Sequence, residues 1–142
     1  MKIDVYSDGS GNTFDSDGGW GFRILVDDKV LLDDSGYLPA ATNNVAELTA
    51  AIEGLKAAKA YIAAAKPKNP QVTLISDSQL VLGYANGQYK CKAIHLAQLY
   101  IQVKSLFSEL RTTAKWVKGH SGDPNNEACD ALAKAGRESK GK

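Results

Sequence analysis

The first third of the chain alternates apolar and polar residues with the period of two that is typical of β-strands. This alternation predicts strands over residues 2–7, 20–26 and 30–37. The second and third of these segments are separated by the polar turn Asp27-Asp28-Lys29, which is typical of a β-hairpin. Three consecutive strands therefore open the predicted fold.

From Thr42 the hydrophobic pattern changes to the period of an α-helix. Thr42, Asn43 or Asn44 can cap the start of this helix, and Pro67 ends it. Its apolar stripe consists of Val45, Leu48, Ile52, Leu55 and Ile62. We therefore expect one long amphipathic helix that packs against the sheet.

Two more strands and three more helices follow in the pattern. They are a strand over residues 71–76, a short helix over 79–86, a helix over 93–110, a strand over 113–117 and a last helix from Pro124. This order predicts an α/β fold in which helices cover a mixed sheet. We expect one domain over residues 1–138 and a disordered tail over residues 139–142.

The composition is that of an ordinary globular domain. The chain has 142 residues, of which 44% are hydrophobic and 23% charged, and this excludes the disordered and low-complexity classes. No segment approaches the ~18 consecutive apolar residues of a membrane span, and the amino terminus lacks the apolar core of a signal peptide. We therefore expect a cytoplasmic monomer with no membrane contact, in which Cys91 and Cys129 are free thiols.

The net charge of +1 hides an uneven distribution of charged residues. Residues 1–89 include 7 basic and 11 acidic side chains, whereas residues 90–119 include 6 and 1. The chain therefore lacks a globally basic surface for nucleic acid, although the second segment could form a local basic patch. The alternative interpretation of that segment is a solvated helix face.

Four carboxylates stand out by their placement in the predicted elements. Asp8 and Asp77 each follow a predicted strand, Glu47 lies early in the long helix, and Asp130 lies in the last helix. If the two strands are adjacent and parallel, Asp8 and Asp77 meet at one edge of the sheet, because sites in open α/β sheets lie beyond the carboxyl ends of strands. Clustered carboxylates repel one another, and a divalent cation would relieve that repulsion.

The ligand type discriminates between metals. A site of Asp and Glu without Cys or clustered His suits Mg²⁺ or Mn²⁺ and argues against structural zinc. Two such ions ~3.5–4 Å apart can activate a water and stabilise the leaving oxygen in phosphodiester cleavage. Because the chain has 16 acidic residues, placement alone leaves ordinary surface solvation as the alternative.

Five short motifs occur along the chain in the order and at the spacing of one known family. They are Asp8-Gly9-Ser10, Thr42-Asn43-Asn44 followed by Glu47, Asp77-Ser78-Gln79, Lys118-Gly119-His120-Ser121-Gly122, and Asn126 followed by Cys129-Asp130. Each motif is short enough to arise by chance, but five in register are specific. Over nearly its whole length the chain resembles the type 1 ribonuclease H family. The resemblance implies the ribonuclease H-like fold, a five-stranded mixed sheet with helices on both faces.

The resemblance also implies an activity. An enzyme of this family is an endonuclease that hydrolyses the RNA strand of RNA–DNA hybrids and leaves 5′-phosphate and 3′-hydroxyl ends. The implied metal ligands are Asp8, Glu47, Asp77 and Asp130, which would bind two Mg²⁺ ions, with Mn²⁺ as a possible substitute. Asp8 would bridge the ions, Glu47 and Asp77 would bind the one on the leaving-group side, and Asp130 the one that activates water. His120 would move protons or help the product leave.

Recognition of a hybrid requires contacts to 2′-hydroxyls across a wide, shallow minor groove, for which short polar side chains are suited. By the family match, Asn43, Asn44 and Gln79 would contact the minor groove and the RNA strand. Ser10 and Asn126 would contact sugars and phosphates near the scissile bond, and Thr42 a phosphate. Trp20 and Trp116 fall in predicted strands, and we expect them in the core rather than against bases.

The chain departs from many relatives in one segment. Those relatives insert a basic helical handle before the helix predicted over residues 93–110, whereas residues 85–93 leave room here for little more than a turn. The phosphate contacts would then fall to side chains such as Lys90, Lys92, Lys104 and Lys118. We therefore expect weak hybrid binding that depends strongly on salt.

Two other functions fit the same fold. A strand-transfer domain of the integrase kind is disfavoured by Asn43-Asn44 and by His120-Ser121-Gly122. A non-catalytic module that only binds hybrids would need no carboxylates, so the presence of all four disfavours it. The metal-dependent hybrid ribonuclease is the hypothesis that the sequence favours.

Overall fold

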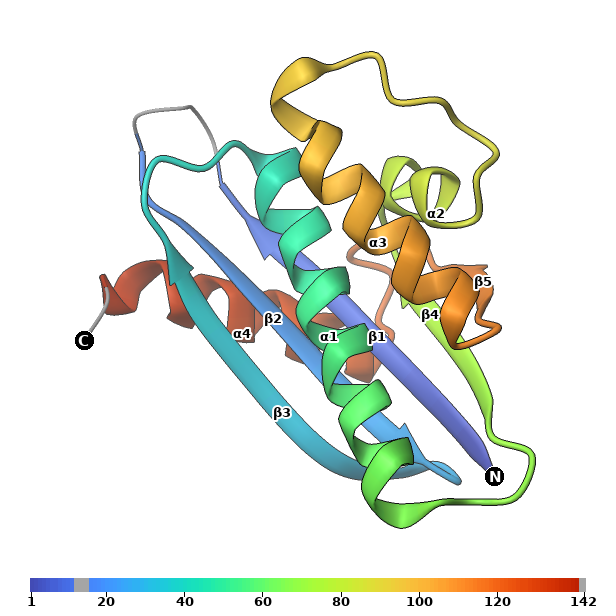
Figure 1. Ribbon diagram of the computed structural model, residues 1–142. Coiled ribbons are helices and arrows are strands. Elements are labelled where there is room, and N and C mark those ends of the chain that lie inside the picture. The colour runs from blue at the N-terminus through green and yellow to red at the C-terminus, as the bar shows by residue number, and fades with distance from the viewer. Residues whose placement is uncertain (12–15, 141–142) are drawn as a thin grey trace.

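A computed structural model describes residues 1–11 and 16–140 of the chain. Within these residues, five strands form one sheet in the order β3-β2-β1-β4-β5 (Figure 1). The strands are β1 (Lys2–Ser10), β2 (Gly18–Val26), β3 (Lys29–Leu38), β4 (Gln71–Ser76) and β5 (Thr113–Trp116). β1 pairs antiparallel with β2 and parallel with β4, so the sheet is mixed, as predicted.

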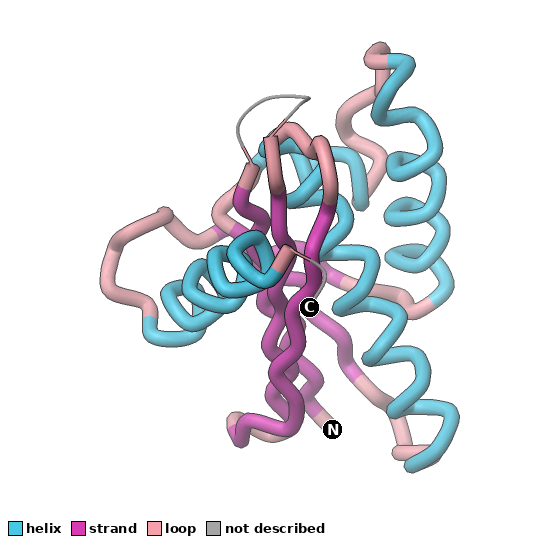
Figure 2. Tube along the Cα trace, turned by 90° about the vertical axis from the view of Figure 1, so that its left-hand side faces the viewer, coloured by secondary structure: helices cyan, strands magenta, loops and turns pink. Residues whose placement is uncertain are grey.

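Helices cover both faces of this sheet (Figure 2). They are α1 (Asn43–Ala65), α2 (Gln79–Ala85), α3 (Ala97–Glu109) and α4 (Pro124–Ser139), with a 3₁₀ turn (Ile94–Leu96) before α3. α1 contacts Val5 and Phe22 through Gly54, whereas α4 contacts Gly21, the strand neighbour of Phe22, on the other face. Successive residues of a strand point to opposite faces, so α1 and α4 lie on opposite sides of the sheet.

The hydrophobic core lies between the sheet and helices α1 to α3. Its fully buried side chains include Ile3, Val5, Ile24, Leu48, Leu55 and Leu74. β1 is the central strand, and it is therefore buried on both faces: Asp4, Ser7 and Asp8 are buried, as are the apolar residues Ile3 and Val5. A strand that alternates apolar and polar residues thus places polar groups in the interior.

The predicted elements agree with the structure in type and order, and most of their ends differ by one or two residues. β1 continues through Ser10, so Asp8 lies inside the strand rather than after it. The helix predicted from residue 93 begins with the 3₁₀ turn and becomes α-helical at Ala97. α4 extends to Ser139, and of the predicted tail the last two residues, 141–142, lie outside the described residues.

The prediction for Trp116 is wrong. Its side chain is 49% exposed, because β5 is an edge strand and all four of its residues are exposed. Trp20, on β2, packs against the core and stacks on Phe22 with ring centroids 5.9 Å apart. A tryptophan in a strand pattern is therefore packed against the core on the inner strand β2 and exposed on the edge strand β5.

The contact between α1 and the sheet predicts that Gly54→Ala destabilises the protein. Helix propensity alone favours alanine by about 1 kcal/mol. A Cβ at Gly54, however, would lie 2.7 Å from Cγ1 of Val5, so the helix must shift away from β1. We expect the free energy of unfolding in urea to fall by about 1–2 kcal/mol.

Ala60→Gly, at an exposed position of the same helix, is the matched control for helix propensity. It is expected to cost about 1 kcal/mol. A Gly54→Ala protein that is more stable than the wild type would contradict the packing argument.

Candidate active site

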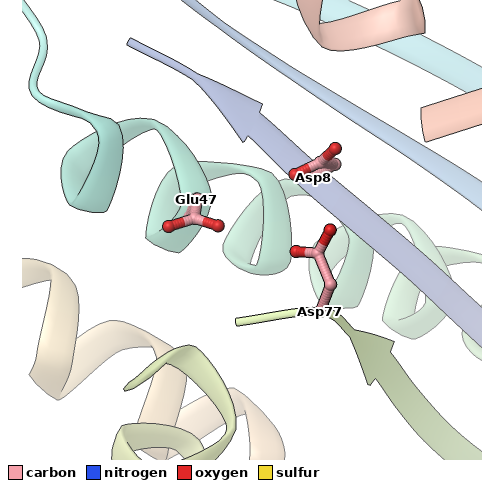
Figure 3. A group of neighbouring side chains, drawn as sticks. All are labelled: Asp8, Glu47 and Asp77. Atoms are coloured by element: carbon pink, nitrogen blue, oxygen red, sulfur yellow. The ribbon is translucent and has the colours of Figure 1, made fainter. Parts of the chain in front are cut away.

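The register between β1 and β4 brings Asp8 and Asp77 together. The parallel pairing ends at Tyr6 opposite Ile75. Asp8 lies two residues after Tyr6, and Asp77 lies two residues after Ile75. Because side chains of a strand alternate, this equal offset directs the two carboxylates to the same side (Figure 3). The condition for this meeting, that the first and fourth strands are adjacent and parallel, is met.

Glu47 reaches the same place from the first turns of α1 (Figure 3). The helix can approach β1 there because Gly9 has no side chain: a Cβ atom would collide with the backbone of Ala46 and Glu47. At its start α1 is capped by Thr42, whose hydroxyl accepts a hydrogen bond of 3.3 Å from the N–H of Val45. The close approach at Gly9 therefore determines where Glu47 lies.

Each of Asp8, Glu47 and Asp77 contributes a carboxylate oxygen to a group in which all such atoms lie within 4.8 Å of one another. We call these three residues the carboxylate cluster. The donors are oxygen atoms only, which is the ligand chemistry that hard divalent cations such as Mg²⁺ and Mn²⁺ prefer. The cluster could therefore hold a divalent metal ion.

The electrostatics of the cluster are unfavourable without a cation. Burial, followed by the charge of Asp77, raises the pKa of Asp8 to about 8, although the N–H of Gly9 donates to its carboxylate at 2.9 Å. Burial and then Asp77 raise the pKa of Glu47 to about 7. Near neutral pH the carboxyl groups of Asp8 and Glu47 therefore remain protonated to a large extent, and a bound cation would displace those protons.

Comparison with known proteins adds to this geometry. The model of the RNase H family matches residues 1–138. The chain belongs to the RNase H family. A ribonuclease H of Chlorobium luteolum is 36% identical over 94% of this chain and 93% of its own, and one of Cupriavidus necator is 33% identical over 100% and 99%.

Solved structures agree with the RNase H fold. The N-terminal RNase H domain of a Mycobacterium tuberculosis protein has a TM-score of 0.83 at 27% identity and covers 99% of this chain and 96% of its own. The RNase H1 called LC11, solved in complex with an RNA/DNA hybrid, has a TM-score of 0.82 at 23% identity, with 96% and 97% covered. The prediction of an RNase H-like fold is confirmed, and the chain is a ribonuclease H-type nuclease.

The fourth carboxylate predicted by the RNase H motifs lies apart from the cluster. Asp130, on α4, forms an ion pair of 3.0 Å with Lys134 one turn later. It is nevertheless close enough that its negative charge contributes to the raised pKa of Asp8. His120 is exposed in the loop before α4, with a left-handed backbone at φ 55°.

Of the residues predicted to bind substrate, three are exposed, two are buried, and Thr42, the cap of α1, is half-buried. Asn43, Asn44 and Gln79 are exposed at the first turns of α1 and α2, close in sequence to Glu47 and Asp77. Ser10 and Asn126 are buried, with 9% and 4% of their surface exposed.

Sequence reasoning missed one contact inside the site. The side-chain amide of Asn43 donates a hydrogen bond of 3.0 Å to Oε1 of Glu47, so it orients that carboxylate as well as facing outward. The spacing of four residues on a helix is the signal that could have revealed it.

No helix in the described ranges, residues 1–11 and 16–140, is long and apolar enough to cross a membrane.

The raised pKa values predict how the stability of the metal-free protein depends on pH. The folded state keeps protons on Asp8 and Glu47 up to about pH 8 and 7, whereas the unfolded chain releases them near 3.8 and 4.5. The folded state therefore binds more protons in this interval, and these groups lower the free energy of unfolding as the pH rises.

Asp8→Asn removes the larger of the two contributions. We expect the free energy of unfolding, measured by urea denaturation in EDTA, to be a few kcal/mol higher for this variant than for the wild type at pH 8.5. The difference should be smaller at pH 5. Added Mg²⁺ should reverse the order by stabilising the wild type alone. An Asp8→Asn effect that is equal at both pH values would contradict the assignment.

Proposed function

We propose that this RNase H enzyme cleaves the RNA strand of RNA–DNA hybrids by two-metal-ion hydrolysis, leaving 5′-phosphate and 3′-hydroxyl ends. The observation that carries the proposal is the carboxylate cluster, in which Asp8 from β1, Glu47 from α1 and Asp77 from the bend after β4 converge. The family supports ribonuclease activity on hybrids, and a protein of the same fold was solved with an RNA/DNA hybrid bound.

The carboxylates would hold two Mg²⁺ ions, with Mn²⁺ as a substitute. Asp8, Glu47 and Asp77 would hold one ion, and Asp8 with Asp130 would hold the other. When bound, such ions lower the pKa of an attacking water and stabilise the negative charge on the leaving oxygen. The ion pair between Lys134 and Asp130 would have to give way or rearrange when that carboxylate becomes a ligand.

The protein's own side chains prepare the site for catalysis. Asp8 and Glu47 give up their protons as the site is filled, and the amide of Asn43 keeps the carboxylate of Glu47 oriented through its hydrogen bond. His120 is exposed on a loop that starts beside Asp77, where an imidazole can accept or donate a proton during cleavage and product release.

Substrate contacts surround the carboxylates. Asn43, Asn44 and Gln79 are short exposed amides within a few residues of Glu47 or Asp77, and they are suited to 2′-hydroxyls and base edges in the minor groove. Thr42 caps α1 and would also contact a phosphate. Ser10 and Asn126, which are buried, would contact sugars and phosphates next to the scissile bond.

The central experiment is cleavage of a hybrid labelled on its RNA strand, with Mg²⁺, Mn²⁺ or EDTA, beside duplex RNA and duplex DNA of the same sequence. We expect metal-dependent cuts confined to the RNA of the hybrid. Asp8→Asn should reduce the rate by at least about 10³-fold while hybrid binding survives, because one ligand charge is lost and the binding surface is kept.

Asp34→Asn is the matched control, since it makes the same chemical change at an exposed position of β3. This edge strand is separated from β4 by β2 and β1. It should cleave like the wild type. Hybrid binding without cleavage under any metal would point to a binding module, and joining of DNA ends would point to a strand-transfer domain. Unchanged cleavage by Asp8→Asn would refute the proposed site.

The few exposed lysines predict that hybrids are bound weakly and in a salt-sensitive way. Residues 86–93, between α2 and the 3₁₀ turn, form no helix, and the lysines available for phosphates, Lys90, Lys92, Lys104 and Lys118, are all exposed. Four phosphate contacts predict that hybrid affinity falls on the order of 100-fold between about 50 and 200 mM salt. Fluorescence anisotropy in EDTA measures this, and an affinity that barely changes would contradict it.

A further inference from the structure

We propose that the segment from Trp116 to Gly119 positions the metal ligand Asp77, with Trp116 and Gly119 as positioning residues. Neither residue is a ligand in the proposed mechanism. The inference rests on the proposed function of the carboxylate cluster, and it extends that function to a pair of contacts from the edge strand β5 and the loop after it.

Asp77 needs support from outside its own strand. β4 ends at Ser76 and α2 begins at Gln79, so Asp77 lies in the bend between them. The hydroxyls of Ser76 and Ser78 stabilise this bend locally, because they accept hydrogen bonds from the N–H groups of Ser78 at 3.0 Å and Val81 at 3.2 Å. These bonds shape the start of α2, and neither of them involves an atom of Asp77.

The end of β5 binds the backbone at this bend. The indole Nε1–H of Trp116 donates a hydrogen bond of 3.1 Å to the backbone carbonyl of Asp77. The next residue, Val117, donates its N–H to the carbonyl of Ser76 at 3.1 Å. Two successive carbonyls at the end of β4 are therefore bound by two successive residues of the neighbouring chain segment, one through a side chain and one through the backbone.

Gly119 then passes directly beside the carboxylate. A Cβ atom built on Gly119 would lie 2.9 Å from Oδ2 of Asp77, closer than a methyl group can approach an oxygen atom without a shift. The backbone of Gly119 is not left-handed, so alanine could adopt it without strain. A methyl group at this position would therefore displace the carboxylate of Asp77, which is the movable end of that side chain.

These contacts give an exposed tryptophan a role. With 49% of its surface exposed, Trp116 adds little to the core, yet its indole N–H binds the residue that carries a ligand. Partners that orient ligands are worth about 10- to 100-fold in metal affinity or activity. The ring also lines an open groove of about 460 Å³ with Gln79 and Tyr89, so the experiment must separate positioning from substrate contact.

The test compares Trp116→Phe, which keeps an aromatic ring and removes the N–H donor, with Gly119→Ala. We expect each to weaken Mn²⁺ binding by about tenfold in calorimetry without substrate. We also expect each to lower kcat at a fixed metal concentration with little change in the KM for hybrid. Thermal unfolding checks that each variant is folded before binding is compared.

Two control variants each reproduce one side effect of the test variants, either a change in the groove or a change in the loop. Tyr89→Leu alters the groove without touching Asp77. Gly122→Ala strains the same loop, because φ of Gly122 is 91°, but its Cβ would meet nothing within 4 Å. Both should bind Mn²⁺ like the wild type.

Wild-type Mn²⁺ affinity and kcat in both Trp116→Phe and Gly119→Ala would overturn the proposal. Equal losses of Mn²⁺ affinity in the control variants would also overturn it, as would a rise in KM alone for Trp116→Phe, which would make the indole a substrate contact. A wild-type protein that binds Mn²⁺ but cleaves no hybrid would refute the proposed function, and the metal-binding comparison would still decide the role of these residues.

Discussion

The parallel register between β1 and β4 is the constraint on which the site depends. It places Asp8 in the central strand and Asp77 just beyond the neighbouring one, on the same side of the sheet. Because Asp8 is only 7% exposed, its charge is poorly solvated and is repelled by the acids around it. The packing that builds the core thus raises the pKa of Asp8, and a bound cation would stabilise its ionised form.

Glu47 and Asp77 are reached by different parts of the chain, and in both cases a glycine allows a close approach. α1 places Glu47 because Gly9 allows the helix to approach β1. The edge strand β5 and its loop reach Asp77 because Gly119 has no side chain. Asp130 lies on α4, across the sheet from α1, outside the cluster and in an ion pair with Lys134. A site assembled in this way responds to small displacements of any of the elements.

Most of the architecture could be predicted from the sequence, because each element has its own hydrophobic period and its own boundary residues, such as Thr42 before α1. The meeting of Asp8 with Asp77 could be predicted once the first and fourth strands were taken as parallel neighbours. Exposure of Trp116 could not, because the local pattern does not say which strand lies at the edge. Bonds between distant segments, such as Trp116 to Asp77, and the raised pKa of Asp8 depend on tertiary packing, which no local pattern contains.

Burial and repulsion from neighbouring carboxylates keep protons on Asp8 and Glu47 until a divalent cation displaces them. Calorimetry of Mn²⁺ binding in buffers of different ionisation enthalpy counts the protons released. Since the pKa values of Asp8 and Glu47 are raised to about 8 and 7, the account predicts release of up to about two protons at pH 6 and close to none at pH 9.5. Binding at pH 6 without proton release would contradict it.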